Sequence, residues 1–358
     1  MSTATAGTST PLGGLGRVPL SLSPLNRKDF TSNQEVKWCP GCGDYAVLAT
    51  FQGLMPQLGI KKENTVIVSG IGCSSRFPYY VDSYGMHSIH GRAPAIATGI
   101  AMARDDLAVW VVTGDGDALS IGGNHLIHAL RRNVNITIML FNNRIYGLTK
   151  GQYSPTSELG KVTKSTPAGS VDAPFNPISL ALGAEASFVA RTVDSHRAHL
   201  SEVLTAAINH RGASFVEIYQ NCPIFNDGAF DELKGPESGL IPVNHGEPIT
   251  FGAQGHLGVV RRADGSLGIA EVAEVGLDHV LVHDAHREDP SLAFELSRLT
   301  DAGQVRTAPI GIFREVQRPA YDDLARAQVS VADTADQRIT ELQGLLAGGD
   351  TWTVATAL

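Results

Sequence analysis

Between residues 37 and 222, short runs of apolar residues alternate with longer stretches in which apolar positions recur every three or four residues. The short runs are nearly continuous in apolar character, which is typical of strands buried on both faces, and the longer stretches have the period of amphipathic helices. We predict strands over residues 65–68, 107–112, 136–141, 188–190 and 215–219, and helices over 44–58, 94–103, 121–132 and 195–209. This alternation predicts an α/β fold, in which a mostly parallel sheet carries helices on both faces.

The periodic pattern weakens towards both ends of the chain. The first residues are rich in Ser, Thr, Gly and Pro and lack the apolar core of a signal peptide, so we predict a flexible N-terminal arm over residues 1–30. Beyond the binding domain predicted over 31–225, several prolines interrupt the pattern. There we predict an irregular C-terminal extension over 226–358 that wraps around a partner. It would contain a hairpin over 255–262 and 267–269 and late helices over 322–328 and 335–346.

Composition narrows the class of protein. The net charge of −8 argues against general nucleic-acid binding. Apolar runs stay well short of the roughly 20 residues that a membrane-spanning helix needs. We therefore expect a cytoplasmic protein that binds neither membranes nor nucleic acid.

The residues that could bind a cofactor or a metal directly follow the predicted strands. Gly70-Ile-Gly-Cys-Ser74, Gly114-Asp-Gly-Asp117, Asn142-Asn143 and Cys222 each follow one of them. Because ligands bind at the carboxyl ends of the strands in parallel sheets, we expect these motifs to meet at one edge.

The Gly114–Asp117 motif combines a flexible backbone with carboxylates. Asp115 and Asn143 lie at the ends of two successive strands, so both can reach one magnesium ion, with the Ile145 carbonyl as a plausible third ligand. Taken alone, the motif is better explained as an ordinary turn, and Asn143 at the matching distance is what favours a cofactor site. The dinucleotide fingerprint G-x-G-x-x-G is not met, because Leu119 occupies its third glycine position.

The chain contains four cysteines, Cys39, Cys42, Cys73 and Cys222. Cys39 and Cys42 enclose Pro40 and Gly41, which favours a tight turn. One shared metal site is the economical interpretation, whereas scattered core thiols are the alternative. Four thiolates suit either an iron–sulfur cluster or structural zinc.

Together these motifs resemble the beta subunits of 2-oxoacid:ferredoxin oxidoreductases, which depend on thiamine diphosphate. The similarity runs from about residue 36 to 225 and includes Asn142–Gln152 and Asn221-Cys-Pro223. The resemblance implies magnesium bound by Asp115, Asn143 and Ile145, and one [4Fe–4S] cluster bound by Cys39, Cys42, Cys73 and Cys222. It further implies thiamine diphosphate lined by Ile71, Gly72, Cys73, Ser74, His90, Gly116, Asp117, Gly147 and Leu148.

The same resemblance implies a reaction and partners. The family oxidatively decarboxylates a 2-oxoacid with coenzyme A and passes the electrons through the cluster to ferredoxin. A glutamate that activates thiamine comes from a separate domain in this family, so we expect activity only with a larger alpha subunit, as an alpha2beta2 heterotetramer. A non-oxidative thiamine enzyme component and a four-cysteine zinc scaffold are the alternatives from other classes.

Three residues are candidates for handling the substrate. Arg76 and Lys150 lie near the two cofactor-binding loops and can pair with carboxylates, of which 2-oxoglutarate carries two. Pyruvate-type relatives tend to have glycine at the position of Lys150. We therefore predict 2-oxoglutarate as the substrate and succinyl-CoA as the product, with pyruvate or other 2-oxoacids as the alternative. His90 is placed to contact the cofactor or transfer a proton.

Overall fold

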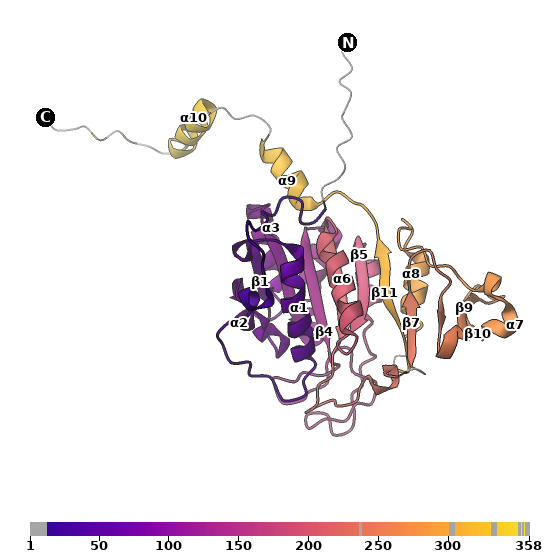
Figure 1. The fold of residues 1–358 in the computed structure, drawn as a ribbon. Coiled ribbons are helices and arrows are strands. Elements are labelled where there is room, and N and C mark those ends of the chain that lie inside the picture. Colours follow the sequence, from indigo (N-terminus) through magenta and orange to yellow (C-terminus); the bar gives the residue numbers. More distant parts are fainter. Residues whose placement is uncertain are drawn as a thin grey trace, which may run out of the picture.

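The computed structural model describes residues 13–235, 238–300, 305–330, 335–349, 352 and 354. Its centre is an eight-stranded sheet with the strand order β2-β1-β3-β4-β6-β5-β11-β7 (Figure 1). The strands are β1 (Thr65–Ser69), β2 (Tyr84–His87), β3 (Ala108–Gly114), β4 (Ile136–Asn142), β5 (Phe188–Val193), β6 (Ala213–Tyr219), β7 (Gly239–Val243) and β11 (Thr307–Glu315). Neighbouring strands run parallel except β5 and β11, so the predicted mostly parallel sheet is confirmed.

Helices cover both faces of this sheet because successive strand residues point to opposite sides. In β3, Val109 and Val111 face one cluster, which also contains α3 (Ala93–Ala103), α4 (Gly123–Arg132), α5 (Pro177–Gly183) and α8 (Ser291–Ser297). Trp110 and Val112 face the other cluster, with α1 (Asp44–Leu58) and α6 (Arg197–Asn209). Figure 1 shows α1 and α6 lying over the same face of the sheet.

Some elements escaped sequence prediction. All four residues of β2 are exposed, so this edge strand has no apolar run to reveal it. Strand β11 contains Pro309 and Gly311, residues that are uncommon inside strands and so hide it from sequence prediction. The residues between β4 and α5 form one long irregular segment that carries several polar contacts described below.

The C-terminal residues are not one separate unit. Strands β7 and β11 extend the central sheet, whereas β8 (Thr250–Phe251), β9 (Leu257–Arg261) and β10 (Leu267–Glu271) form a small second sheet. The pairing of β9 with β10 confirms the predicted hairpin. Helices α9 (Tyr321–Ser330) and α10 (Ala335–Leu346) confirm the two late helices, and α10 stands apart from the body (Figure 1). That the extension wraps around a partner stays a prediction.

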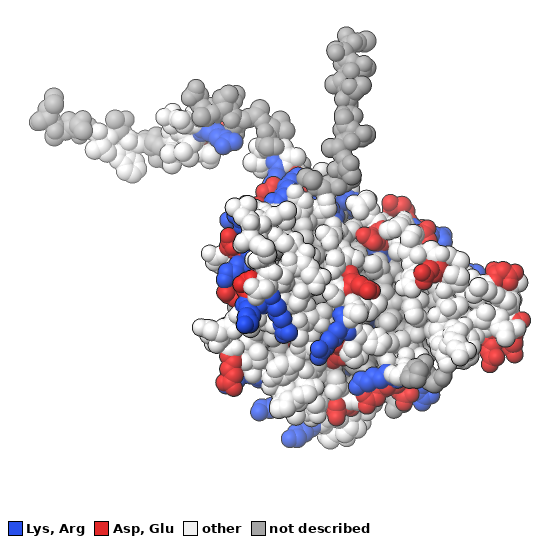
Figure 2. Space-filling view, viewed as in Figure 1, with Lys and Arg blue, Asp and Glu red and all other residues white. Residues whose placement is uncertain are grey.

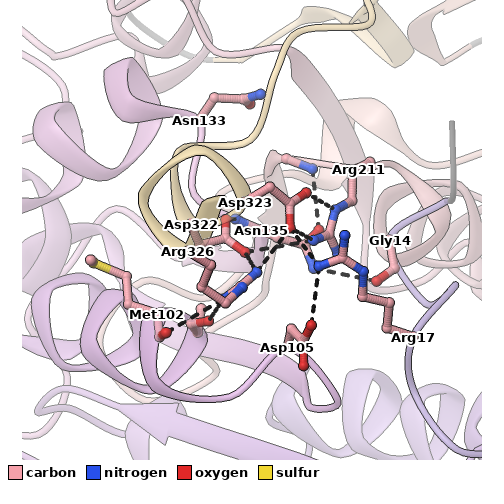
Figure 3. A network of polar contacts seen from close by, with 12 residues as sticks. Gly14, Arg17, Met102, Asp105, Asn133, Asn135, Arg211, Asp322, Asp323 and Arg326 are labelled. Atoms are coloured by element: carbon pink, nitrogen blue, oxygen red, sulfur yellow. Dashed lines mark hydrogen bonds and ion pairs between the residues drawn. The ribbon is translucent and has the colours of Figure 1, made fainter. Parts of the chain in front are cut away.

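An ion-pair network fastens α9 to the body at the end of the sheet where the strands begin (Figure 3). Asp323 contacts Arg17 at 2.8 Å and Arg211 at 2.9 Å, and Asp322 accepts a hydrogen bond from the backbone N–H of Asn135. Arg17 also pairs with Asp105 at 3.1 Å. The described part of the predicted flexible arm, residues 13–30, therefore packs against the body, and residues 1–12 lie outside the described residues.

The remaining charges are distributed over the surface. Figure 2 shows acidic and basic side chains interspersed on the face that it draws. Among the described residues, no helix combines the length and the apolar character needed to cross a membrane.

A buried histidine makes the stability of the fold depend on pH. His210 is 4% exposed, its Nε2 lies 2.7 Å from Ser187 Oγ, and burial lowers its pKa to about 4. In the unfolded chain His210 is protonated below about pH 6.5, whereas in the folded chain it stays neutral down to about pH 4. The free energy of unfolding is therefore highest above pH 6.5 and falls by about 3 kcal/mol as the pH drops towards 4. Denaturant unfolding of the purified chain at pH 7 and pH 4 measures this loss. His210→Gln should flatten the pH dependence, whereas His256→Gln, at an exposed site, should leave it unchanged. Equal slopes in both variants would contradict the assignment.

Candidate cofactor site

The predicted cofactor residues meet in one pocket at the carboxyl ends of β1, β3 and β4. The loops after these three strands lie side by side because the strands are adjacent and parallel. The pocket is lined by Ile71, Gly72, Cys73, Ser74, His90, Gly114, Asp115, Gly116, Asp117, Phe141, Asn143, Ile145, Tyr146, Gly147, Leu148 and Thr149. All nine residues predicted for thiamine diphosphate and all three predicted for magnesium are among them.

Asp115 is buried and held by hydroxyl groups. Ser154 Oγ and Thr156 Oγ1 both donate to its Oδ2, at 2.5 Å and 2.6 Å. Burial raises the pKa of this carboxyl to about 6, although both hydrogen bonds act against the shift. The two donors fix the orientation of the carboxylate, and its negative charge favours a nearby cation.

The turn after β4 has a strained backbone. Arg144 has φ of 58°, in the left-handed region that a residue with a side chain seldom adopts. Its guanidinium Nε donates to the Thr156 carbonyl at 2.9 Å, and Ser157 Oγ donates to the Arg144 carbonyl at 2.6 Å. We call residues 154–158 the strap, because they tie this turn to Asp115. Sequence reasoning missed the strap, although the run of Ser and Thr hydroxyls within 154–157 was its visible signal.

The Asp117 side chain connects its own loop to two others through hydrogen bonds. Its carboxylate accepts hydrogen bonds from the Ile71 N–H at 3.1 Å, the Gly91 N–H at 2.7 Å and Thr113 Oγ1 at 2.6 Å. His90 Nδ1 lies 2.7 Å from the same carboxylate, but not in line for a hydrogen bond. Asp117 therefore lines the pocket and shapes it, while its oxygens are engaged by the protein itself.

Two glycines of the motifs are required by close packing. A Cβ on Gly116 would lie 2.1 Å from the ring of Tyr146, whose hydroxyl donates to the Gly116 carbonyl at 3.0 Å. A Cβ on Gly70 would lie 1.9 Å from Asp117 Oδ2. Tyr146 and Asp117 thus explain these glycines without any ligand.

The four cysteines come from three loops that converge beside the pocket. A Cβ built on Gly147 would lie 3.5 Å from Cys73 Sγ and 3.8 Å from Cys222 Sγ, so these two sulfurs flank one glycine. Burial raises the pKa of the Cys73 thiol to about 11 and also raises that of Cys42, and the nearby Cys222 adds to both shifts. Cys39 is exposed. The set therefore extends from the pocket to the surface.

The described residues do not include three His, Cys, Asp or Glu side chains that converge on a single metal ion. A tetrahedral zinc site needs its thiolates around one atom. The iron–sulfur cube instead binds each thiolate to a different iron, which keeps the sulfurs further apart.

The two candidate substrate residues lie outside the pocket lining. Arg76 is half-buried, and its Nη1 donates to the Lys37 carbonyl at 3.2 Å. Lys150 is exposed at the end of the turn after Leu148, with φ of 84°. His90, by contrast, lines the pocket, and its side chain is 38% exposed.

Comparison with known proteins identifies the class of protein to which this fold and pocket belong. The family model for the thiamine pyrophosphate enzyme C-terminal TPP binding domain matches residues 70–218, the part of the chain that contains the pocket loops after β1, β3 and β4. The chain therefore carries a thiamine diphosphate-binding domain.

Individual relatives narrow the class to a family. The 2-oxoglutarate oxidoreductase subunit KorB of Mycobacterium tuberculosis is 64% identical over 340 residues, which cover 94% of this chain and 91% of that relative. The beta subunit of 2-oxoacid:ferredoxin oxidoreductase 1 from Aeropyrum pernix is 46% identical over 190 residues, 53% of this chain and 60% of that relative. The chain belongs to the family of 2-oxoacid oxidoreductase beta subunits.

A solved structure agrees with this family. The 2-oxoglutarate:ferredoxin oxidoreductase from Magnetococcus marinus, with 2-oxoglutarate, coenzyme A and succinyl-CoA bound, contains a chain that matches with a TM-score of 0.73 and 33% identity. The match covers 92% of this chain and 99% of that one.

Proposed function

We propose that this chain is the beta subunit of a 2-oxoglutarate:ferredoxin oxidoreductase. The enzyme would convert 2-oxoglutarate and coenzyme A to succinyl-CoA and carbon dioxide, with an alpha subunit in an alpha2beta2 assembly. The observation that carries this proposal is the position of the cysteines: Cys73 lines the cofactor pocket, and Cys39 of the same set is exposed. A redox centre held there would connect the pocket with an external acceptor such as ferredoxin.

The residues around Asp115 fit magnesium. Magnesium prefers hard oxygen ligands, often one or two protein groups together with phosphate oxygens. The Asp115 carboxylate, the Asn143 amide and the Ile145 carbonyl supply that set from one pocket. Because Asp115 is buried, a cation would relieve the cost of its charge. These three groups would hold the ion, and the ion would hold the diphosphate.

The cysteines fit a [4Fe–4S] cluster. Buried thiols with raised pKa values are costly to ionise, and iron provides the positive charge that compensates for it. Cys39, Cys42, Cys73 and Cys222 would each bind one iron.

When bound, thiamine diphosphate would supply a nucleophilic carbon for the 2-oxo carbon and an electron sink for the pair that stays behind when carbon dioxide leaves. The chain positions the reactants around it. The His90 Nδ1 lies 2.7 Å from the Asp117 carboxylate, whose negative charge would stabilise a protonated His90 ring. That leaves His90 Nε2 to hold or transfer a proton within the pocket.

The substrate assignment depends on Lys150. A lysine at φ of 84° carries a backbone cost of about 1 kcal/mol that glycine would avoid. Such a cost is typical of positions where the side chain has a function. Both the Mycobacterium tuberculosis relative and the Magnetococcus marinus structure are named for 2-oxoglutarate. Lys150 would pair with the distal carboxylate, and Arg76 with the other.

Replacing Lys150 with glycine should change substrate preference. We expect Lys150→Gly to raise the KM for 2-oxoglutarate about tenfold, the loss of roughly one charge pair, and to leave the KM for pyruvate unchanged. Lys164→Gly, at another exposed lysine of the same irregular segment, is the matched control. Steady-state dye reduction with both acids measures the effect, and an unaltered ratio of the two KM values would refute the role of Lys150.

The function itself is tested on the complex. The chain is co-expressed with the alpha subunit, purified without oxygen and assayed for coenzyme A-dependent dye reduction with a panel of 2-oxoacids. We expect a brown protein containing iron and sulfide that prefers 2-oxoglutarate. A colourless protein that contains zinc, or turnover that does not need an electron acceptor, would refute the proposal.

A further inference from the structure

Gln220 lies between the two candidate sites. It directly follows β6 and is 1% exposed. Its Oε1 accepts a hydrogen bond from Asn143 Nδ2 at 3.0 Å, and its Nε2 donates to Cys42 Sγ at 3.2 Å. One buried amide therefore contacts a proposed magnesium ligand on one side and a proposed cluster ligand on the other.

The backbone around Gln220 holds this side chain in place. The Gln220 N–H donates to the Asn142 carbonyl at 3.0 Å, which extends the pairing of β6 with β4 by one residue. On the other side, a Cβ on Gly43 would lie 3.0 Å from Gln220 Cγ and 1.8 Å from Asp194 Oδ2. Glycine at position 43 thus lets the Cys42 loop approach Gln220 closely.

The direction of the two hydrogen bonds decides what each neighbour can do. Asn143 uses its amide nitrogen for Gln220, so its Oδ1, which is the atom able to bind a cation, lies on the other side of the amide, where it also accepts the Ile145 N–H at 3.2 Å. Cys42 receives an N–H donor at its sulfur. A donor to a cluster sulfur stabilises the additional negative charge of the reduced cluster and so raises its reduction potential.

We propose that Gln220 is a positioning residue that serves both sites: it orients the Asn143 amide for magnesium and raises the reduction potential of the cluster through Cys42. This role rests on the proposed function. It goes beyond the ligand set, because Gln220 itself binds neither cofactor.

Two substitutions separate the two contacts. Gln220→Glu keeps an acceptor for Asn143 but removes the donor to Cys42, so the cluster potential should fall while the magnesium requirement stays near that of the wild type. Gln220→Leu removes both contacts. It should lower the potential and raise the magnesium concentration for half-maximal thiamine diphosphate binding about tenfold.

Gln52→Leu is the matched control. Gln52 is also a buried glutamine, 4% exposed, and its Nε2 donates to the Tyr80 carbonyl at 2.9 Å, away from the pocket. Gln52→Leu should lower the free energy of unfolding by a similar amount. It should change neither the cluster potential nor the magnesium dependence of thiamine diphosphate binding.

The measurements use the anaerobically purified complex of both subunits. Redox titration followed by electron paramagnetic resonance gives the cluster potential, and calorimetry at graded magnesium gives cofactor binding. Wild-type protein that holds no cluster or no thiamine diphosphate would refute the proposed function. If the wild type holds both, a wild-type potential in Gln220→Glu would refute the inference alone, and this holds even if Gln220→Leu does not fold. Unchanged magnesium dependence in a folded Gln220→Leu would also refute it.

Discussion

Replacing Cys222 with serine should remove the cluster and leave cofactor binding intact. Cys222 is buried beside Cys73, but only Cys73 lines the cofactor pocket. A cube deprived of one of its four thiolates is expected to be lost, so iron and sulfide should fall close to zero and dye reduction by at least 100-fold. Thiamine diphosphate binding should stay within about twofold of the wild type, because the pocket lining is unchanged.

Cys73→Ser provides the comparison. Because Cys73 belongs to both the pocket and the cysteine set, this variant should lose the cluster and also bind thiamine diphosphate less tightly. Iron and sulfide analysis, visible absorption and calorimetry on the complex distinguish the two variants. Full iron content in Cys222→Ser would exclude that residue as a ligand, and bound zinc in the wild type would exclude the cluster.

Removing the Asp115 carboxylate should abolish magnesium-dependent binding of thiamine diphosphate. Asp115→Ala removes a charged ligand from a buried position, so we expect no measurable binding at magnesium concentrations that saturate the wild type. Thr156→Val keeps the carboxylate but removes one of its two hydroxyl donors. Loss of such an outer contact typically costs 10-fold to 100-fold in metal affinity, so this variant should bind with an intermediate affinity.

Asp172→Asn is the control for this series. Asp172 is an exposed carboxylate of the same irregular segment and accepts a hydrogen bond from the Tyr153 hydroxyl at 2.8 Å. Asp172→Asn should leave the magnesium dependence of thiamine diphosphate binding unchanged. If Asp115→Ala bound the cofactor as tightly as the wild type, the ion would have to be held by other groups, and the proposed ligand set would be wrong.

The polar contacts of the site show where sequence reasoning reached its limit. Cys73, Asp115 and Asn143 could be placed together, because each follows a strand of a parallel sheet. The strap could not be foreseen, because hydroxyl residues in an irregular segment have no periodic pattern. The hydrogen bonds of Asp117 could not be foreseen for a similar reason. They include the backbone N–H groups of Ile71 and Gly91, and a backbone N–H leaves no signal in the sequence.

The sequence by itself determined which loops carry the functional residues and that these loops meet at one edge of the sheet. Continuous apolar runs specify buried parallel strands, and the parallel arrangement brings residues 70–74, 114–117 and 142–143 to one edge whatever the details of packing. Only the tertiary structure decided how individual side chains are used. It placed Gln220 between Asn143 and Cys42 and kept Arg76 and Lys150 outside the pocket lining. Such contacts depend on distances between segments far apart in the chain, which hydrophobic periodicity does not encode.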